Sequence, residues 1–264
     1  MTKYMTFRKK LSSASKKNNS LLCVGLDTDA KKISGSQFEF NKKIIDATHD
    51  LVCVYKPNTA FYESLGAEGI ENLKQSIDYI KNTYPEIPVI LDAKRGDIGN
   101  TNEGYIEFAF NYLKADAITL HPYMGKRSLD PFLKMEEKTF FILCRTSNEG
   151  AGEFQNLLVN SKPLYELVAQ HVKDEWNYNG NCGLVVGATY PKELKRIREI
   201  APDLPFLIPG IGAQGGDVEK TVSAGIDTNG ENAIINSSRS IIFAQNPREE
   251  AEKLKKLINS YRKI

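Results

Sequence analysis

The chain has 264 residues, of which 41% are hydrophobic and 26% are charged. This hydrophobic fraction suffices for a buried core, so the composition excludes an intrinsically disordered chain. A formal net charge of +2 lacks the strong basic excess of a general nucleic-acid binder. No apolar run approaches the roughly 20 residues that a membrane-spanning helix requires. We therefore expect partners to include neither nucleic acid nor a membrane.

The four cysteines are widely spaced and form no C-x-x-C pair. This spacing excludes the usual zinc motifs and gives no sign of a disulfide framework. Each cysteine lies in an apolar stretch, so we expect buried free thiols in a reducing compartment, with the cytoplasm as the default location. The residues are Cys23, Cys53, Cys144 and Cys182.

The chain begins with a predicted amphipathic helix that has Phe7 and Leu11 on its inner side. Short apolar runs rich in β-forming residues then recur along the chain. Most are continuous rather than alternating, as expected for strands buried on both faces of a parallel sheet. These predicted strands are residues 21–26, 51–56, 89–94, 117–121, 139–145, 183–187, 205–208 and 232–236.

Segments with helical periodicity lie between these strands. In residues 70–84, Ile70, Leu73, Ile77 and Ile80 are spaced three and four apart, which is typical of one buried helix face. Two other segments begin with proline, which suits the first turn of a helix. The predicted helices are residues 38–49, 70–84, 163–176, 191–200 and 254–261.

Eight strands separated by helical segments indicate an α/β protein. Strand starts recur about every 30 residues, which suits repeated strand–helix units, and no linker separates two halves. We therefore predict one domain over residues 1–264, a closed (β/α)8 TIM barrel with an additional N-terminal helix. An open doubly wound sheet is the alternative, since periodicity alone does not count strands reliably.

The active sites of such barrels lie at the carboxyl ends of the strands, where several charged residues of this chain occur. Asp92 and Lys94 are two apart in the third strand, so their side chains share a face. Together with Lys56 and Asp97 they can form a chain of alternating charges. A purely structural ion-pair network is the alternative. Such arrays also tune pKa values for proton transfer, and we therefore predict catalysis here.

A glycine-rich segment at residues 209–217 follows the seventh predicted strand. Its glycines satisfy G-x-G-x-x-G, the pattern of dinucleotide-binding turns. However, the segment follows the seventh strand rather than the first, and no convincing ribose-binding acid ends the next strand. Glycine-rich backbone after strand seven, with Arg239 after strand eight, is instead typical of a phosphate site in barrels. A tight turn without a ligand is the remaining alternative.

Two further features have weaker signals. His121 ends the fourth strand, and the lack of a nearby Ser or Cys nucleophile favours a packing role over acid–base catalysis. Residues 146–152 form a polar, glycine-bearing segment after the fifth strand and open the longest gap between strands. We expect this segment to be a mobile lid over the site.

Taken in order, these motifs resemble the orotidine 5′-phosphate decarboxylase family over nearly the whole chain. The stretch at residues 92–101, DAKRGDIGNT, is similar to the family's Asp-x-Lys-x-x-Asp signature in its bacterial type 2 form. Five other segments support the resemblance, and six matched segments in the right order are more specific than any one. They are residues 24–27, 55–58, 145–148, 209–216 and 238–240.

The resemblance implies decarboxylation of orotidine 5′-phosphate to uridine 5′-phosphate and carbon dioxide, with no metal or organic cofactor. It makes Lys94 the proton donor to C6 of the pyrimidine and places Asp92 beside the departing carboxylate. Lys56 and Asp97 complete the charge chain. The resemblance also implies a homodimer in which Asp97 reaches into the partner's site together with two neighbours, Ile98 and Thr101.

The same resemblance implies where the rest of the substrate binds. Asp27 and Lys56 would bind ribose hydroxyls, Ser147 the edge of the pyrimidine, and Gln214 and Arg239 the phosphate. The full set of implied substrate-binding residues is Asp27, Asn58, Ile98, Thr101, Ser147, Pro209, Gln214 and Arg239. Many relatives have glycine where this chain has Ser238, which changes the geometry expected at the phosphate.

Two other functions remain open from the residues alone. A nicotinamide-dependent oxidoreductase would use the glycine-rich segment, and a non-catalytic barrel would use the same segment for phosphate binding.

Overall fold

The computed structural model describes residues 5–212 and 215–262 of the chain. Its central sheet has eight parallel strands in the order β2-β1-β10-β9-β8-β5-β4-β3. The strands are β1 (Leu22–Gly25), β2 (Val54–Lys56), β3 (Ile90–Arg95), β4 (Ala117–Leu120), β5 (Thr139–Arg145), β8 (Cys182–Val186), β9 (Phe206–Pro209) and β10 (Ala233–Ser237).

The two outermost strands of this order, β2 and β3, meet and close the sheet. Tyr55 pairs with Val89 and Asn58 pairs with Asp92 in parallel bridges. The Asp92 amide also donates to the carbonyl of Pro57 at 2.9 Å. The predicted (β/α)8 barrel is therefore confirmed, and the open-sheet alternative is wrong. The second strand begins at Val54, three residues later than predicted, because the apolar residues before it lie in a buried turn.

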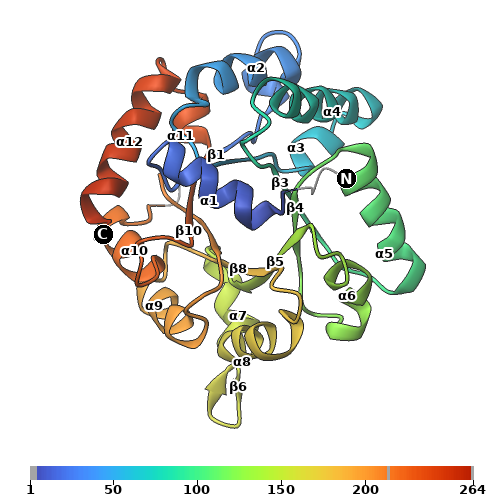
Figure 1. The fold of residues 1–264 in the computed structure, drawn as a ribbon, viewed down its shortest axis with the longest axis vertical. Helices are drawn as coiled ribbons and strands as arrows, with labels where there is room; N and C mark the ends of the chain where they lie inside the picture. Colours follow the sequence, from blue (N-terminus) through green and yellow to red (C-terminus); the bar gives the residue numbers. More distant parts are fainter. Residues whose placement is uncertain (1–4, 213–214, 263–264) are drawn as a thin grey trace.

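Helices surround the barrel on its outside (Figure 1). All five predicted helical segments are present, although their bounds shift by a few residues. They are α2 (Gln37–Thr48), α4 (Gly66–Thr83), α8 (Leu164–His171) continued by η4 (Val172–Trp176), α9 (Pro191–Ile200) and α12 (Pro247–Tyr261). The last begins earlier than predicted, because Asn246 caps its first turn through a bond from the Glu249 amide and Pro247 suits that turn.

The remaining helical and hairpin segments have weak apolar periodicity or are short, so the sequence did not show them. The helices are α3 (Ala60–Glu63), α5 (Gly99–Ile106) with η2 (Glu107–Tyr112), α6 (Lys126–Leu133), α7 (Gly152–Gln155), α10 (Val218–Gly225) and α11 (Arg239–Ile242). Two single turns, η1 (Ala30–Lys32) and η3 (Glu149–Ala151), and a small hairpin of β6 (Leu158–Val159) and β7 (Lys162–Pro163) complete the chain. Within residues 5–212 and 215–262, no helix has the length and apolar character needed to span a bilayer.

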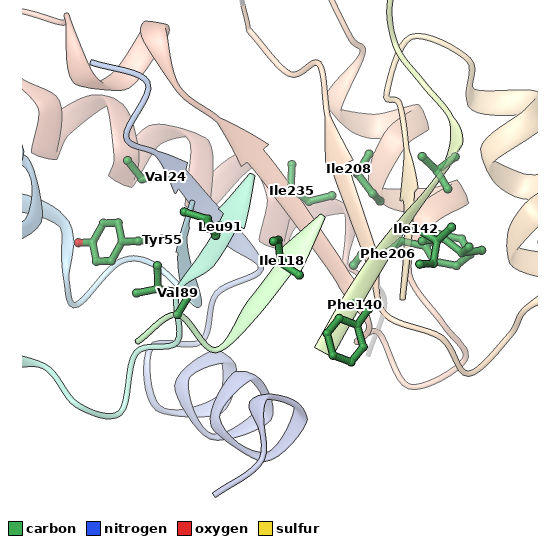
Figure 2. Close-up of a cluster of buried hydrophobic side chains, with 14 of the residues drawn as sticks. Val24, Tyr55, Val89, Leu91, Ile118, Phe140, Ile142, Phe206, Ile208 and Ile235 are labelled. Carbon is green, nitrogen blue, oxygen red and sulfur yellow. The ribbon is translucent and has the colours of Figure 1, made fainter. Parts of the chain in front are cut away.

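The main hydrophobic core lies between the strands and the helices. Alternate strand residues face outward into it and meet the apolar faces of the surrounding helices. Figure 2 shows part of this layer, to which β1, β3, β4, β5, β9 and β10 contribute Val24, Leu91, Ile118, Phe140, Ile142, Phe206, Ile208 and Ile235. The four cysteines are buried and free, as predicted.

The N-terminal helix α1 (Phe7–Lys17) closes one end of the barrel. It crosses the centre of the ring in Figure 1. Phe7 and Leu11 are buried together with strand residues that face the inside of the barrel. The rings of Phe7 and Phe141 pack edge to face, with their centres 5.7 Å apart. Lys10 pairs with Asp116, just before β4, at 3.0 Å. The helix therefore covers the amino ends of the strands and leaves the carboxyl ends open.

This arrangement predicts that Phe7→Ala lowers the free energy of unfolding by about 3–5 kcal/mol, because it leaves a cavity beneath the barrel. Urea denaturation monitored by circular dichroism measures the change, with Met5→Ala as the control because Met5 is half exposed. A loss below about 1 kcal/mol in Phe7→Ala would show that α1 does not stabilise the barrel.

Candidate active site

A cavity of about 460 Å³ opens at the carboxyl ends of the strands. This is the end opposite α1, where the sequence predicted the site. Eight of the twelve predicted site residues line the cavity, contributed by six strands or the loops that follow them. These eight are Asp27, Lys56, Asn58, Asp92, Lys94, Ser147, Pro209 and Arg239.

A chain of alternating charges lies along one wall of the cavity. The Lys56 ammonium lies 3.6 Å from Asp27 Oδ1 and 3.1 Å from Asp92 Oδ2. On its other oxygen, Asp92 accepts from the Lys94 ammonium at 2.7 Å. The Lys56 side chain is only 3% exposed, whereas that of Lys94 is 48% exposed. Lys94 is therefore the more accessible of the two ammoniums, although both residues line the cavity.

Both buried members of this chain remain charged. Burial raises the pKa of Asp92, but the Lys56 and Lys94 ammoniums outweigh it and hold that pKa well below its usual range. Burial lowers the pKa of Lys56, and the carboxylates of Asp27 and Asp92 reverse this effect and raise it above its ordinary value. The cavity wall thus presents fixed charges of both signs at neutral pH.

A distortion of β3 places Lys94 beside Asp92. The pairing of β3 with β4 shifts register between Leu91 and Arg95. Within this bulge Lys94 has φ +48°, a left-handed conformation that costs a non-glycine residue about 1–3 kcal/mol. Thr119 of β4 stabilises the bulge, since its hydroxyl accepts from the amides of Ala93 and Lys94 at 3.0 and 2.9 Å and donates to Asp92 Oδ1 at 3.0 Å.

Asp97, Ile98 and Thr101 do not line the cavity of their own chain. The charge chain therefore runs from Asp27 through Lys56 and Asp92 to Lys94, and Asp97 does not extend it. Asp97 follows β3 and turns the chain into α5, and its carboxylate accepts from the amide of Ile98 at 2.7 Å. Ile98 is 57% exposed.

Two neighbouring residues hold the Asp97 loop. Asn102, fully buried, accepts from the Asp97 amide at 2.9 Å and donates to the carbonyls of Asp97 and Ser128. His121 lies against Gly96, whose carbonyl is 2.8 Å from its Nε2 atom. This contact agrees with the packing role expected for His121.

The described residues of the glycine-rich segment after β9, on either side of residues 213 and 214, lie close together at the cavity rim. Gly210 and Gly212 have φ +114° and +90°, and the Gly216 amide donates back to the Gly210 carbonyl at 3.0 Å. Pro209, Gly210 and Ile211 line the cavity, as does Arg239 after β10, whose side chain is exposed. Gln214 lies outside the described residues.

The Ser238 side chain lies where the side chain of any residue larger than glycine at position 25 of β1 would be. A Cβ atom on Gly25 would lie 1.8 Å from the Ser238 hydroxyl oxygen. The serine hydroxyl, just after β10, therefore points toward Gly25 of β1. The Gly25–Ser238 contact is the structural consequence of having serine rather than glycine at position 238.

The sequence of this chain matches the profile of the orotidine 5′-phosphate decarboxylase / HUMPS family over residues 20–254. The chain belongs to this family. Orotidine 5′-phosphate decarboxylase of Cupriavidus taiwanensis is 51% identical over 254 residues, which cover 94% of this chain and 93% of that protein. The Herpetosiphon aurantiacus enzyme of the same name is 49% identical and covers 97% of this chain and 96% of its own length. The resemblance inferred from the motifs is thus confirmed.

Solved structures of the family share the fold. The Leishmania donovani OMP decarboxylase has a TM-score of 0.90 and 43% identity, covering 98% of this chain and 99% of that one. The UMP synthase of the same organism has a TM-score of 0.92 and 45% identity. This chain spans 57% of the length of that synthase.

Several cavity residues were missed from the sequence because single polar residues in apolar or loop segments have no motif. Gln155 of α7 and Asn236 of β10 line the cavity, and Asn148 lies beside Ser147. Asn236 accepts from the buried Cys23 thiol at 3.3 Å. Among the described residues, no group of three or more His, Cys, Asp or Glu side chains is arranged to bind a metal ion.

We predict that Asn102→Ala loosens the loop that contains Asp97, because it leaves the Asp97 amide and the Ser128 carbonyl without partners. Hydrogen–deuterium exchange should become at least about tenfold faster in peptides covering residues 95–102, as expected from a loss of 1–3 kcal/mol in local stability. Asn111→Ala is the control, since Asn111 is exposed and, within the described residues, its side chain bonds only Glu107 on the same helical segment. Unchanged exchange in Asn102→Ala would contradict the proposed support of this loop.

Proposed function

We propose that this protein converts orotidine 5′-phosphate to uridine 5′-phosphate and carbon dioxide, the last step of de novo UMP biosynthesis. Family membership supports decarboxylation of this nucleotide. The observation that carries the finer proposal is the accessible Lys94 ammonium beside the ionised, buried Asp92. These two groups lie in a cavity that also contains an exposed arginine for the phosphate.

In the proposed reaction, the bond between C6 of the pyrimidine and its carboxylate breaks. Carbon dioxide leaves, and the electron pair of the broken bond remains on C6. The Lys94 ammonium stabilises this developing charge and then gives its proton to C6, which forms uridine 5′-phosphate. Asp92 holds the Lys94 side chain in place through its carboxylate, and it lies beside the departing carboxylate of the substrate. This chemistry needs neither a metal ion nor an organic cofactor.

One ion pair supplies only part of the rate enhancement. At about 4 Å and an effective dielectric constant near 20, an ammonium and a carbanion attract by about 4 kcal/mol. Enzymes lower barriers by roughly 8–23 kcal/mol. The remainder must come from binding energy at the phosphate and ribose, used to position the base against Lys94.

The residues around the charge chain are assigned to the other parts of the substrate. Arg239, the glycine-rich turn with Pro209, and Gln214 bind the phosphate. Asp27 and Lys56 bind the ribose hydroxyls. Asn58 lies beside them, and its side-chain nitrogen donates to Asp92 Oδ2 at 3.3 Å. Ser147 contacts the edge of the pyrimidine. With the exception of Gln214, the residues named in these assignments line the same cavity, which supports the proposal.

We further propose a cytoplasmic homodimer in which Asp97, Ile98 and Thr101 complete the partner's site. Their position outside the cavity of their own chain supports this. Large exposed apolar side chains on the loops after β3 and β4 also support it, because such groups mark interfaces. Ile98, Tyr123 and Met124 are 57%, 90% and 43% exposed. The proposal includes a single domain over residues 1–264 and the type 2 form of the family.

The proposal predicts that the purified protein consumes orotidine 5′-phosphate, seen as a loss of ultraviolet absorbance, and that Lys94→Ala slows this at least about a thousandfold. Affinity for uridine 5′-phosphate should be retained, because the phosphate and ribose contacts remain. Lys114→Ala is the matched control, since Lys114 is an exposed lysine with a similar φ of +58°.

Near-normal turnover by Lys94→Ala would exclude the proposed proton donor. If the unmodified protein shows no turnover, the decarboxylase proposal itself is wrong. A thermal shift with NADH but not with uridine 5′-phosphate would then favour an oxidoreductase.

A further inference from the structure

A buried arginine lies directly behind the segment that carries Ser147. Arg145, at the end of β5, is 1% exposed and is the largest fully buried side chain. Among the residues described, it makes no ion pair with a carboxylate. A buried charge without a counterion is costly unless polar contacts compensate for it. The contacts that Arg145 does make therefore indicate why the residue is there.

Those contacts lead to the segment of Thr146, Ser147 and Asn148. The Arg145 guanidinium donates to the Thr146 carbonyl at 3.0 Å and to the Gln155 side-chain oxygen at 3.3 Å. Its Cζ atom lies over the Tyr190 ring, 3.7 Å from the ring centre. This stacking is a contact that arginine makes well and lysine does not.

Gln155 holds the same segment from the cavity side. Its oxygen accepts from the Thr146 amide and its nitrogen donates to the Thr146 hydroxyl, both at 2.9 Å. The Thr146 hydroxyl in turn donates to the Asn148 side chain at 2.7 Å. Gln155 is the last residue of α7, so these bonds fasten the predicted lid segment to the end of β5.

The loop after β8 holds the segment from the opposite side. Thr189 donates to the Ser147 carbonyl at 3.1 Å, and the Tyr190 hydroxyl donates to the Asn148 carbonyl at 3.4 Å. Gly187 lets this loop approach closely, because a Cβ atom there would lie 2.7 Å from Ser147. Ser147 is thus fixed by contacts to both of its neighbours and to its own backbone.

We infer that Arg145 and Gln155 are positioning residues that set specificity for the nucleobase. They hold Thr146, Ser147 and Asn148 rigidly at the part of the cavity where, under the proposed function, the pyrimidine edge binds. A preformed segment binds its ligand without the cost of ordering a loop. The phosphate and ribose contacts arise from other strands and do not depend on these two residues.

Two ligands separate this role from general structural support. Uridine 5′-phosphate contains base, ribose and phosphate, whereas ribose 5-phosphate lacks the base. Dissociation constants are measured for Gln155→Ala and Arg145→Lys, by calorimetry for the nucleotide and by ³¹P NMR for the sugar phosphate. Gln170→Ala is the control, because Gln170 is partly exposed, like Gln155, and among the described residues its side chain bonds only Asp174.

We expect Gln155→Ala to weaken uridine 5′-phosphate binding about tenfold, equivalent to 1.4 kcal/mol, and ribose 5-phosphate binding less than about twofold. Arg145→Lys retains one donor but loses the stacking, so its effect should have the same selectivity. In the double variant, the loss of uridine 5′-phosphate affinity should be smaller than the product of the two losses in the single variants, because both residues act through Thr146.

Unchanged nucleotide affinity in Gln155→Ala, or an equal loss for both ligands, would overturn the inference. Independent effects in the double variant would overturn the claim that the two residues act together. Gln155 is partly exposed, so this variant tests the inference even if Arg145→Lys fails to fold. Failure of the unmodified protein to bind uridine 5′-phosphate would instead contradict the proposed function.

Discussion

Asp92 between two ammoniums is the interaction on which the site depends. Its oxygens accept from Lys56 on one side and Lys94 on the other, with Thr119 and Asn58 completing its contacts. A carboxylate buried this deeply would be neutral without those partners. Because Asp92 stays ionised, it holds the Lys94 side chain in position at the cavity before any substrate enters, which is the preorganisation that electrostatic catalysis requires.

The barrel supplies the geometry for this interaction. Closure between β2 and β3 brings Asn58 and Asp92 into one bridge, so the closing seam and the charge chain share residues. The bulge in β3 turns Lys94 onto the same carboxylate at the cost of a left-handed backbone. At the other end α1 buries the amino ends of the strands. Packing by α1 thus stabilises the amino ends of the strands, whereas the strained backbone of Lys94 lies at the carboxyl ends, where the chemistry is proposed.

The parts of this arrangement that follow from local pattern could be predicted from the sequence. Continuous apolar runs predicted the strands. The position of Asp92 and Lys94 at the end of the third strand, two residues apart, predicted that both lie at the mouth of the barrel. Asp97 belongs to the same motif but lies outside the cavity of its own chain, since one turn of backbone after β3 redirects it. Gln155, Asn102 and Arg145 could not be predicted, because their roles depend on contacts between separate loops. Short helices such as α3 and α11 were missed because four residues show no periodicity.

The ionisation of Asp92 also has a consequence for stability. Its pKa in the folded protein lies below the ordinary aspartate value of 3.8, so the unfolded chain takes up this proton at a higher pH than the folded protein does. The contribution of Asp92 is therefore complete above that value and is lost as the pH falls toward the folded pKa. Acid should weaken the charge chain and the fold together.

The most direct test of this account is a ¹³C NMR titration of the aspartate carboxyl groups in the folded protein. The Asp92 signal is assigned by its absence in Asp92→Asn and followed from about pH 7 to about pH 3, the range in which ordinary aspartates titrate. The account predicts that this signal stays that of a carboxylate while exposed aspartates protonate. A midpoint near or above 3.8 would contradict it, because Asp92 would then not be held ionised by Lys56 and Lys94.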